Sequence, residues 1–215
     1  MSLKKYKIMS GDLDKTDEIF DTILRLGIDK EILARSSTLL IIQIYASLIS
    51  RAENVFKIID EINKMEGTFK RGLSHTKEPA MFGRKPYLKG LWHKHYIGSD
   101  VSSMAKNAMN ALKNYGLPKL NAEIEEVARL GEERYFTPDD AGKIAHEAVV
   151  DNYLRRSCEG KLTGHWIIYA IHNGINYYLC LARHTDDEKE IRKEIDAICL
   201  NEFPFLKEIL HPFSE

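Results

Sequence analysis

Residues 164–184 read GHWIIYAIHNGINYYLCLARH, and this stretch decides the fold that the sequence predicts. Two runs rich in β-branched and aromatic residues flank Asn173-Gly174, a strong short-range signal for a two-residue type I′ hairpin turn. Most of the remaining chain shows helical periodicity and helix-capping residues. The sequence therefore predicts an α+β fold, mostly helical, with a small antiparallel sheet centred on a hairpin of residues 165–183.

The predicted turn also assigns the hairpin residues to two faces. Side chains alternate along a strand, so the register in which Tyr169 opposes Tyr178 places both tyrosines on one face. His165 and His184 then lie on that same face, at the open end of the hairpin. The opposite face begins with Trp166 and is more uniformly apolar, which suits packing against helices.

Residues 1–66 are expected to be helical. Between Ser36 and Met65, apolar residues recur in steps of four and three, the spacing of an apolar seam along one face of a single long helix. This seam either packs on the rest of the chain, which we favour, or forms the contact of a homodimer. Its members are Ile41, Tyr45, Leu48, Ala52, Val55, Ile59 and Ile62.

Residues 67–100 form a basic segment with interleaved aromatic residues, which predicts a long loop. It contains five glycines and two prolines. Loops of this length are uncommon in compact domains unless they bind a ligand or are mobile. Cations such as Arg84 could contact phosphate and aromatic rings such as Trp92 could stack on bases; alternatively, the aromatic residues pin a solvated loop to the core.

The part of this loop richest in potential catalytic or metal-binding side chains is LWHKHY, residues 91–96. If the segment is extended, His93 and His95 point to one side and Lys94 to the other. A pair of histidines separated by one residue can supply half of a metal site, because neutral imidazole is a common zinc ligand. The pattern is short, and we expect no bound metal.

The remaining residues, 101–215, are expected to form helices, the hairpin and a C-terminal helix within one domain that spans 1–215. The chain has 31 Lys and Arg against 32 Asp and Glu, so RNA would have to bind through a local basic patch. The three cysteines show no paired spacing, which favours reduced thiols. No segment looks like a secretory signal or a membrane span, and we expect a cytoplasmic protein.

The two hairpin histidines suggest a catalytic role. One imidazole can act as a base and the other as an acid near neutral pH, while Arg183 or Lys94 neutralises a phosphate and a tyrosine hydroxyl orients it. This set suits cleavage of RNA through attack by the 2′-hydroxyl. Alternatively, His165 and His184 only flank a buried hairpin.

The hairpin together with the charged segment TDDEKEIRKEIDAI, residues 185–198, resembles the C-terminal layout of RelE-type toxins and, more loosely, of barnase-like and EndoU-like ribonucleases. The resemblance covers residues 162–198. It implies helices packed on an antiparallel sheet and cleavage of RNA without a metal.

The leading prediction is therefore a metal-independent, toxin-like ribonuclease that needs no cofactor. The first alternative is a non-enzymatic interaction protein that dimerises through the 36–65 helix. The second is a metal-dependent hydrolase that uses His93, His95 and His184. The candidate catalytic residues are His165, His184, His93, His95, Tyr169 and Tyr178. The candidate substrate-binding residues are Lys94, Arg183, Trp92 and Arg84.

Overall fold

The predicted hairpin lies at the centre of an antiparallel sheet in a computed structural model that describes residues 6–68, 74–98, 100–131 and 133–211. Its strands are β5 (His165–His172) and β6 (Ile175–Ala182). Asn173 and Gly174 have φ values of 52° and 74°, the left-handed pair that a type I′ turn requires. The sheet continues through β4 (Trp92–Tyr96) to β3 (Ala80–Met81), in the order β3-β4-β5-β6.

The hairpin register contains a β-bulge that the sequence did not indicate. Tyr169 pairs with Tyr178 as predicted, but Ile168 pairs with Cys180, so Leu179 is an extra residue in β6. Every later residue of β6 is thereby moved to the other face of the sheet. The predicted common face for His165 and His184 is therefore wrong.

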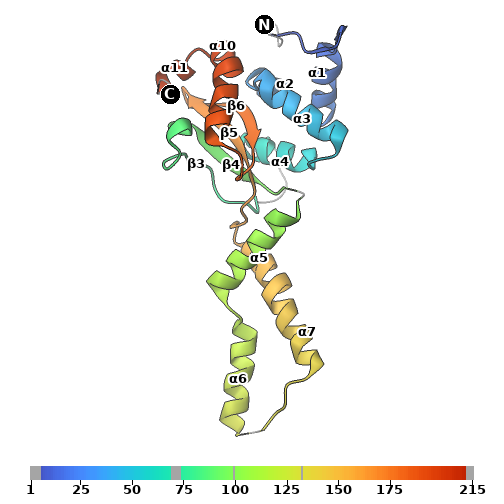
Figure 1. The fold of residues 1–215 in the computed structure, drawn as a ribbon, viewed down its shortest axis with the longest axis vertical. Helices are drawn as coiled ribbons and strands as arrows, with labels where there is room; N and C mark the ends of the chain where they lie inside the picture. Colours follow the sequence, from blue (N-terminus) through green and yellow to red (C-terminus); the bar gives the residue numbers. More distant parts are fainter. Residues whose placement is uncertain (1–5, 69–73, 99, 132, 212–215) are drawn as a thin grey trace.

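Helices cover both faces of the sheet, whereas the sequence indicated helix packing only on the face that begins with Trp166. One face packs, through Ile167 and Tyr169, against helices from the N-terminal part of the chain. The other, through Trp166 and Ile168, packs against the C-terminal helical segments (Figure 1). The N-terminal helices are α1 (Thr16–Arg25), α2 (Lys30–Ala34), α3 (Thr38–Ser50) and α4 (Val55–Met65). The C-terminal segments are α9 (Glu188–Glu194), η3 (Ile195–Cys199), α10 (Leu200–Glu202) and α11 (Leu206–Ile209).

The predicted single helix over residues 36–65 is wrong, because it is interrupted between α3 and α4. Arg51 adopts a left-handed conformation with φ of 55°, which ends α3. The Asn54 side chain then accepts a hydrogen bond from the Phe56 amide and caps α4. The seam residues Ile41, Val55 and Ile59 are buried in the core of the chain, as the favoured interpretation required.

Residues 92–96 of LWHKHY form a strand rather than part of a long loop. All five residues of β4 pair with β5, and the segment before β4 contains β3 and η1 (Pro86–Leu88). The aromatic side chains explain this outcome, because Phe82, Trp92 and Tyr96 pack into the two cores. A separate small hairpin joins β1 (Met9–Ser10) to β2 (Leu13–Asp14).

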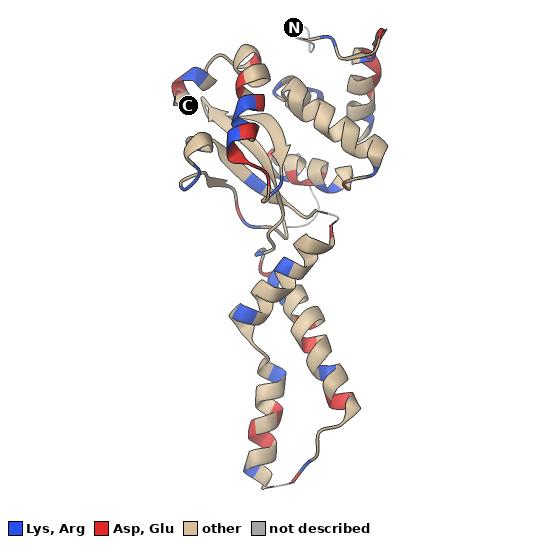
Figure 2. Ribbon diagram, viewed as in Figure 1, with Lys and Arg blue, Asp and Glu red and all other residues tan. Residues whose placement is uncertain are grey.

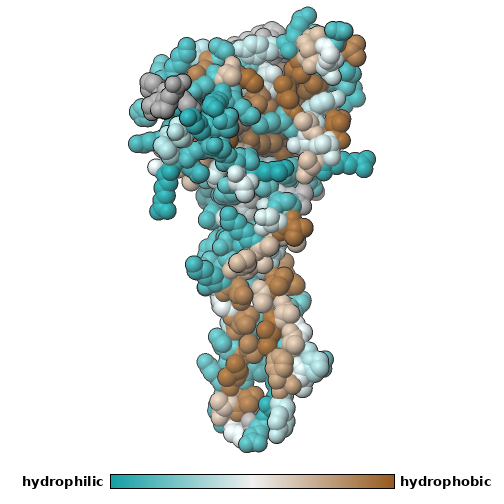
Figure 3. Space-filling view, in the orientation of Figure 1, coloured by the Kyte–Doolittle hydropathy of each residue, from teal (hydrophilic) through white to brown (hydrophobic). Residues whose placement is uncertain are grey.

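A helical arm projects from the body that contains the sheet, which we call the head (Figure 1). The arm consists of α5 (Val101–Tyr115), α6 (Pro118–Leu130), α7 (Pro138–His146), η2 (Glu147–Asp151) and α8 (Asn152–Cys158). The last three form one continuous helix with a π-helical segment at η2. Apolar side chains gather along the arm (Figure 3), and charges of both signs follow its helices (Figure 2).

The architecture is α+β, mostly helical, with a small antiparallel sheet, as the sequence predicts. Whether the head and the arm unfold as the single predicted domain stays a prediction. Within the described part of the chain, no helix combines the length and the apolar character needed to cross a membrane.

Candidate functional site

A cavity of about 270 Å³ lies where the open end of the hairpin meets the first turns of α5. Its wall comes from residues 100–106, 163–165 and 183–185. The head and the arm therefore both contribute to it. His165 reaches the cavity from the start of β5 and His184 from the segment after β6, so the two histidines meet here although the bulge separates their faces.

His165 is enclosed and faces two carboxylates. Its side chain is only 9% exposed, and its Nε2 atom lies 2.9 Å from Asp100 Oδ2 and 3.4 Å from Glu53 Oε1. Neither ring nitrogen is aligned for a hydrogen bond with any group in the described residues. His165 therefore presents Nε2 to Glu53 and Asp100 rather than to the open part of the cavity.

Asp100 has a second task as the N-cap of α5. Its Oδ1 atom accepts a 2.7 Å hydrogen bond from the Ser103 amide, and its Oδ2 atom accepts one of 2.8 Å from the Ser103 hydroxyl. Burial opposes ionisation of this carboxyl group, but the Ser103 hydrogen bonds and the neighbouring His165 lower its pKa below the ordinary value. Asp100 is therefore ionised and held in place at neutral pH.

His184 is the more open of the two cavity histidines. Its ring stacks on His95 at a centroid distance of 5.2 Å and meets Trp166 edge-on at 4.4 Å. Burial of the ring and then the nearby Lys106 cation lower the pKa of His184 to about 4. The imidazole is consequently neutral at pH 7 and can accept a proton.

His93 and His95 lie on the same side of β4, as the alternation predicted. The His93 ring stacks on Phe82 at 4.4 Å, and His95 Nδ1 lies 3.0 Å from the Gly164 carbonyl oxygen. Burial lowers the pKa of both side chains, that of His95 to about 3. These two rings therefore belong to a row of packed aromatic rings that ends at His184.

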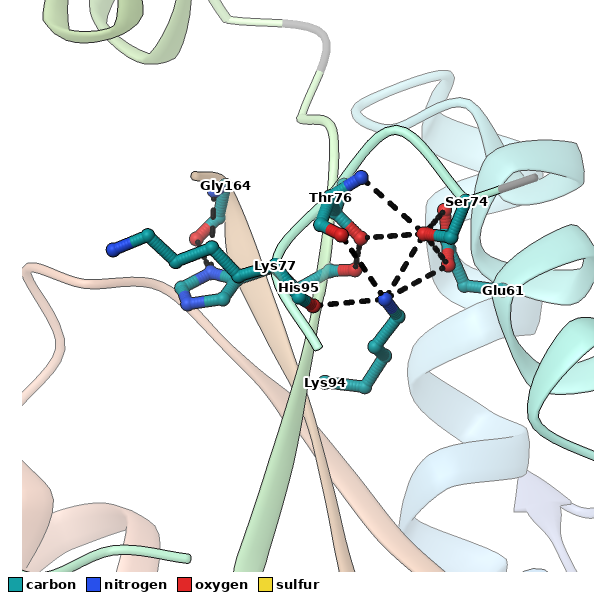
Figure 4. A network of polar contacts seen from close by, with 7 residues as sticks. All are labelled: Glu61, Ser74, Thr76, Lys77, Lys94, His95 and Gly164. Carbon is teal, nitrogen blue, oxygen red and sulfur yellow. Dashed lines mark hydrogen bonds and ion pairs between the residues drawn. The ribbon is translucent and has the colours of Figure 1, made fainter. Parts of the chain in front are cut away.

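Lys94 points to the other side of β4 and is almost fully buried (Figure 4). Its ammonium group donates hydrogen bonds to Ser74 Oγ at 2.9 Å and to the Lys77 carbonyl oxygen at 2.8 Å, and it pairs with Glu61 at 3.5 Å. Burial lowers the pKa of Lys94, an effect that the Glu61 carboxylate opposes. Lys94 thus fastens residues 74–77 to the sheet and does not line the cavity.

The other predicted site residues lie away from the cavity. Tyr169 and Tyr178 are buried under the N-terminal helices, where the Tyr178 hydroxyl donates a 2.7 Å hydrogen bond to Glu66. Trp92 packs against the same core, and Arg84 is exposed beyond β3. Of the predicted site residues, those that line the cavity are His165, His184 and Arg183.

The structure adds three charged residues that the sequence did not single out: Glu53, Asp100 and Lys106. Glu53 was assigned to the interior of a long helix, and only the break after α3 brings it to the cluster. Asp100 directly precedes α5, so the sequence suggests only that it caps this helix and gives no sign of a second role. The sequence around Lys106 carries no signal, because lysines on helix surfaces are ordinary.

Among the described residues, one group of side chains could together hold a metal ion: Glu53, Asp100 and His165, whose ligand atoms lie within 4.8 Å of one another. The triplet His93, His95 and His184 predicted for a metal-dependent hydrolase is not such a set. The rings of that triplet stack or meet edge-on instead of directing nitrogen atoms at a common point.

The chain matches no family model, no curated protein and no solved structure. The resemblance of residues 162–198 to toxin-like ribonucleases therefore stays a prediction.

Proposed function

We propose that this chain is a phosphodiester-cleaving enzyme that cuts RNA in the cavity between the hairpin and α5. The observation that carries the proposal is the grouping, in one cavity, of two cations, Lys106 and Arg183, with the neutral imidazole of His184. Cations held at fixed positions stabilise the charge that develops on a phosphate in the transition state.

The proposed reaction requires one base and an internal nucleophile. His184 accepts the proton of the ribose 2′-hydroxyl, and the 2′-oxygen forms a bond to phosphorus. The bond from phosphorus to the 5′-oxygen breaks, and that oxygen takes a proton from solvent. The products are a 2′,3′-cyclic phosphate and a 5′-hydroxyl, and Lys106 and Arg183 hold the phosphate oxygens throughout.

This assignment changes the role of His165. Its ring nitrogens are enclosed, and Nε2 faces Glu53 and Asp100, so it shapes the cavity wall instead of exchanging a proton with RNA. His184 supplies the base and solvent supplies the proton for the leaving oxygen, so no step of the proposed reaction uses a metal. RNA cleavage is therefore expected in the presence of a chelator.

The test is cleavage of a labelled RNA oligonucleotide in excess EDTA, compared with the DNA oligonucleotide of the same sequence. Wild-type protein should cut RNA and leave DNA intact, because DNA lacks the 2′-hydroxyl. His184→Gln should lower the rate on the order of a hundredfold. The matched control is His172→Gln, which alters a histidine at the turn end of the hairpin and should retain wild-type activity.

The pH dependence gives an independent readout. The base must be neutral to act, so the rate should rise as the pH increases through about 4, the pKa of His184, and level off above it. Absence of RNA cleavage by the folded wild-type protein between pH 5 and pH 9 contradicts the proposal, as does full activity of His184→Gln.

The two alternatives have less support. Dimerisation through residues 36–65 would need an exposed seam, but Ile41, Val55 and Ile59 face the core of the same chain. A hydrolase that holds its metal with His93, His95 and His184 would need ring nitrogens directed at one point, whereas these rings pack against one another.

A further inference from the structure

Glu53, Asp100 and His165 meet at the joint between the head and the arm. Glu53 lies in the connection between α3 and α4, Asp100 caps the first helix of the arm, and His165 begins β5. Their nearest ligand atoms lie within 4.8 Å of one another although the residues are far apart in the sequence. Two carboxylates and an imidazole are thus gathered by the tertiary fold alone.

We propose that Glu53, Asp100 and His165 bind one divalent transition-metal ion, which fastens the start of the arm to the head. This site adjoins the proposed RNA-cleaving group, because Asp100 and His165 line the same cavity and Arg183 lies 3.9 Å from Glu53. The two sets share no residue, since His184, Lys106 and Arg183 are not ligands of the ion. Binding of the ion and cleavage of RNA can therefore be measured separately.

The spacing of the donor atoms suits a metal. Zinc and similar ions bind imidazole nitrogen and carboxylate oxygen at about 2.1 Å, which places two ligands about 3.0 Å apart at a right angle and about 3.4 Å apart at a tetrahedral angle. The distances from His165 Nε2 are 2.9 Å to Asp100 and 3.4 Å to Glu53. Three protein ligands also leave coordination positions for water.

The orientation of the His165 ring also supports a metal site. At 2.9 Å from Asp100, Nε2 is close enough to donate a hydrogen bond, but the two atoms are not aligned for one. A buried nitrogen without such a bond carries a desolvation cost. A metal ion in contact with all three ligand atoms would use the Nε2 lone pair and remove that cost.

The backbone is also adapted to this close approach. A Cβ atom added to Gly98 would lie 2.6 Å from the His165 ring and 2.7 Å from Asp100 Oδ2, so any side chain larger than glycine's would push the ligands apart. The Glu53 side chain is 7% exposed and lies 3.9 Å from the Arg183 guanidinium. Mutual repulsion of the two carboxylates would fall sharply beside a divalent cation.

The experiment titrates the full chain with Mn²⁺. The protein carries no affinity tag, and EDTA first strips it of metal and is then removed. Electron paramagnetic resonance reports the free ion. We expect one tight Mn²⁺ per chain, a higher melting temperature, and slower amide hydrogen exchange at the start of α5. Mn²⁺ is the probe of choice because it prefers carboxylate oxygen and binds poorly to the exposed Cys158 thiol.

The variants Glu53→Gln, Asp100→Asn and His165→Gln should each lower the Mn²⁺ affinity on the order of tenfold or more. Asp100→Asn is the most informative, since asparagine still caps α5 and the variant should fold normally. The matched controls, Asp139→Asn and His146→Gln, change exposed residues of the arm and should bind Mn²⁺ like the wild type.

Failure to bind Mn²⁺ tightly, or tight binding that Asp100→Asn leaves unchanged, overturns the metal site. The outcome for RNA cleavage is separate. Mn²⁺ binding without RNA cleavage retains the metal site and rejects the ribonuclease, whereas RNA cleavage in EDTA by a chain that binds no Mn²⁺ does the reverse.

Discussion

The head and the arm are stabilised in different ways. In the head, helices cover both faces of the sheet, and residues such as Ile44 and Ile62 are fully buried. In the arm, α6 has no buried residue, and Ile124 is 56% exposed. Apolar burial, the main favourable term in folding, is therefore concentrated in the head. A helix without a packed face is marginal in water, so the arm depends on other interactions.

Those interactions are polar and lie at the ends of the arm helices. The Glu147 carboxylate accepts hydrogen bonds from the backbone amides of Lys119 and Leu120 and thereby caps α6 from the neighbouring helix. Thr137 and Asp140 form a capping box at the start of α7. Each contributes about 1 kcal/mol, less than one large core side chain. The same type of substitution should therefore change the free energy of unfolding by different amounts in the head and in the arm.

The largest difference is expected for apolar truncations. Ile44→Ala in the head should lower the free energy of unfolding by about 2 to 5 kcal/mol, because it leaves a cavity in a closed core. Ile124→Ala in the arm should change it by less than about 0.5 kcal/mol. Urea denaturation followed by circular dichroism measures both. Equal losses would mean that the apolar face of α6 is covered in solution.

The second contrast concerns lysines. Lys94→Met should lower the free energy of unfolding by about 3 kcal/mol, because it leaves the Glu61 carboxylate buried without its cation. Lys143→Met in the arm removes the 3.8 Å ion pair between an exposed lysine and Asp140, which Arg134 also contacts, and should have an effect within about 0.5 kcal/mol. A stable Lys94→Met protein that has lost RNA cleavage would restore the phosphate-binding role predicted from the sequence.

The third contrast uses pH. Burial lowers the pKa of His95 to about 3 in the folded chain, from an ordinary value of 6.5. The unfolded chain therefore binds more protons between these values, and stability is complete above pH 7 and falls as the pH decreases. We expect this side chain to account for a loss of about 3 kcal/mol between pH 7 and pH 4. His95→Gln should flatten this dependence, whereas His146→Gln in the arm should leave it unchanged.

The smallest effect concerns local opening of the arm. Ala128→Gly in α6 should lower helix stability by about 1 kcal/mol and increase amide exchange only within the arm. Amides of β5 and β6 should keep their protection in hydrogen exchange measured by mass spectrometry. A matching increase of amide exchange in the strands would show that the head and the arm unfold as one unit, which is what the single-domain prediction expects.

The sequence by itself determined the elements whose signals are local. Asn173-Gly174 predicts the hairpin because only residues that tolerate positive φ fit a type I′ turn, and both have positive φ. Alternation along LWHKHY correctly separated Lys94 from His93 and His95 once the segment was taken as extended. The start of α7 is local in the same way, because the N-cap Thr137 and Pro138 at the first helical position act through neighbouring residues alone.

Only the tertiary structure decided the composition of the cavity and of the proposed metal site. The bulge at Leu179 moved His184 to the other face of the sheet, and the break after α3 brought Glu53 to His165. Both depend on packing between segments that are distant in the chain, where burial outweighs the small free-energy differences that distinguish one register or helix end from another. Periodicity describes one segment at a time, so it could not show which segments meet.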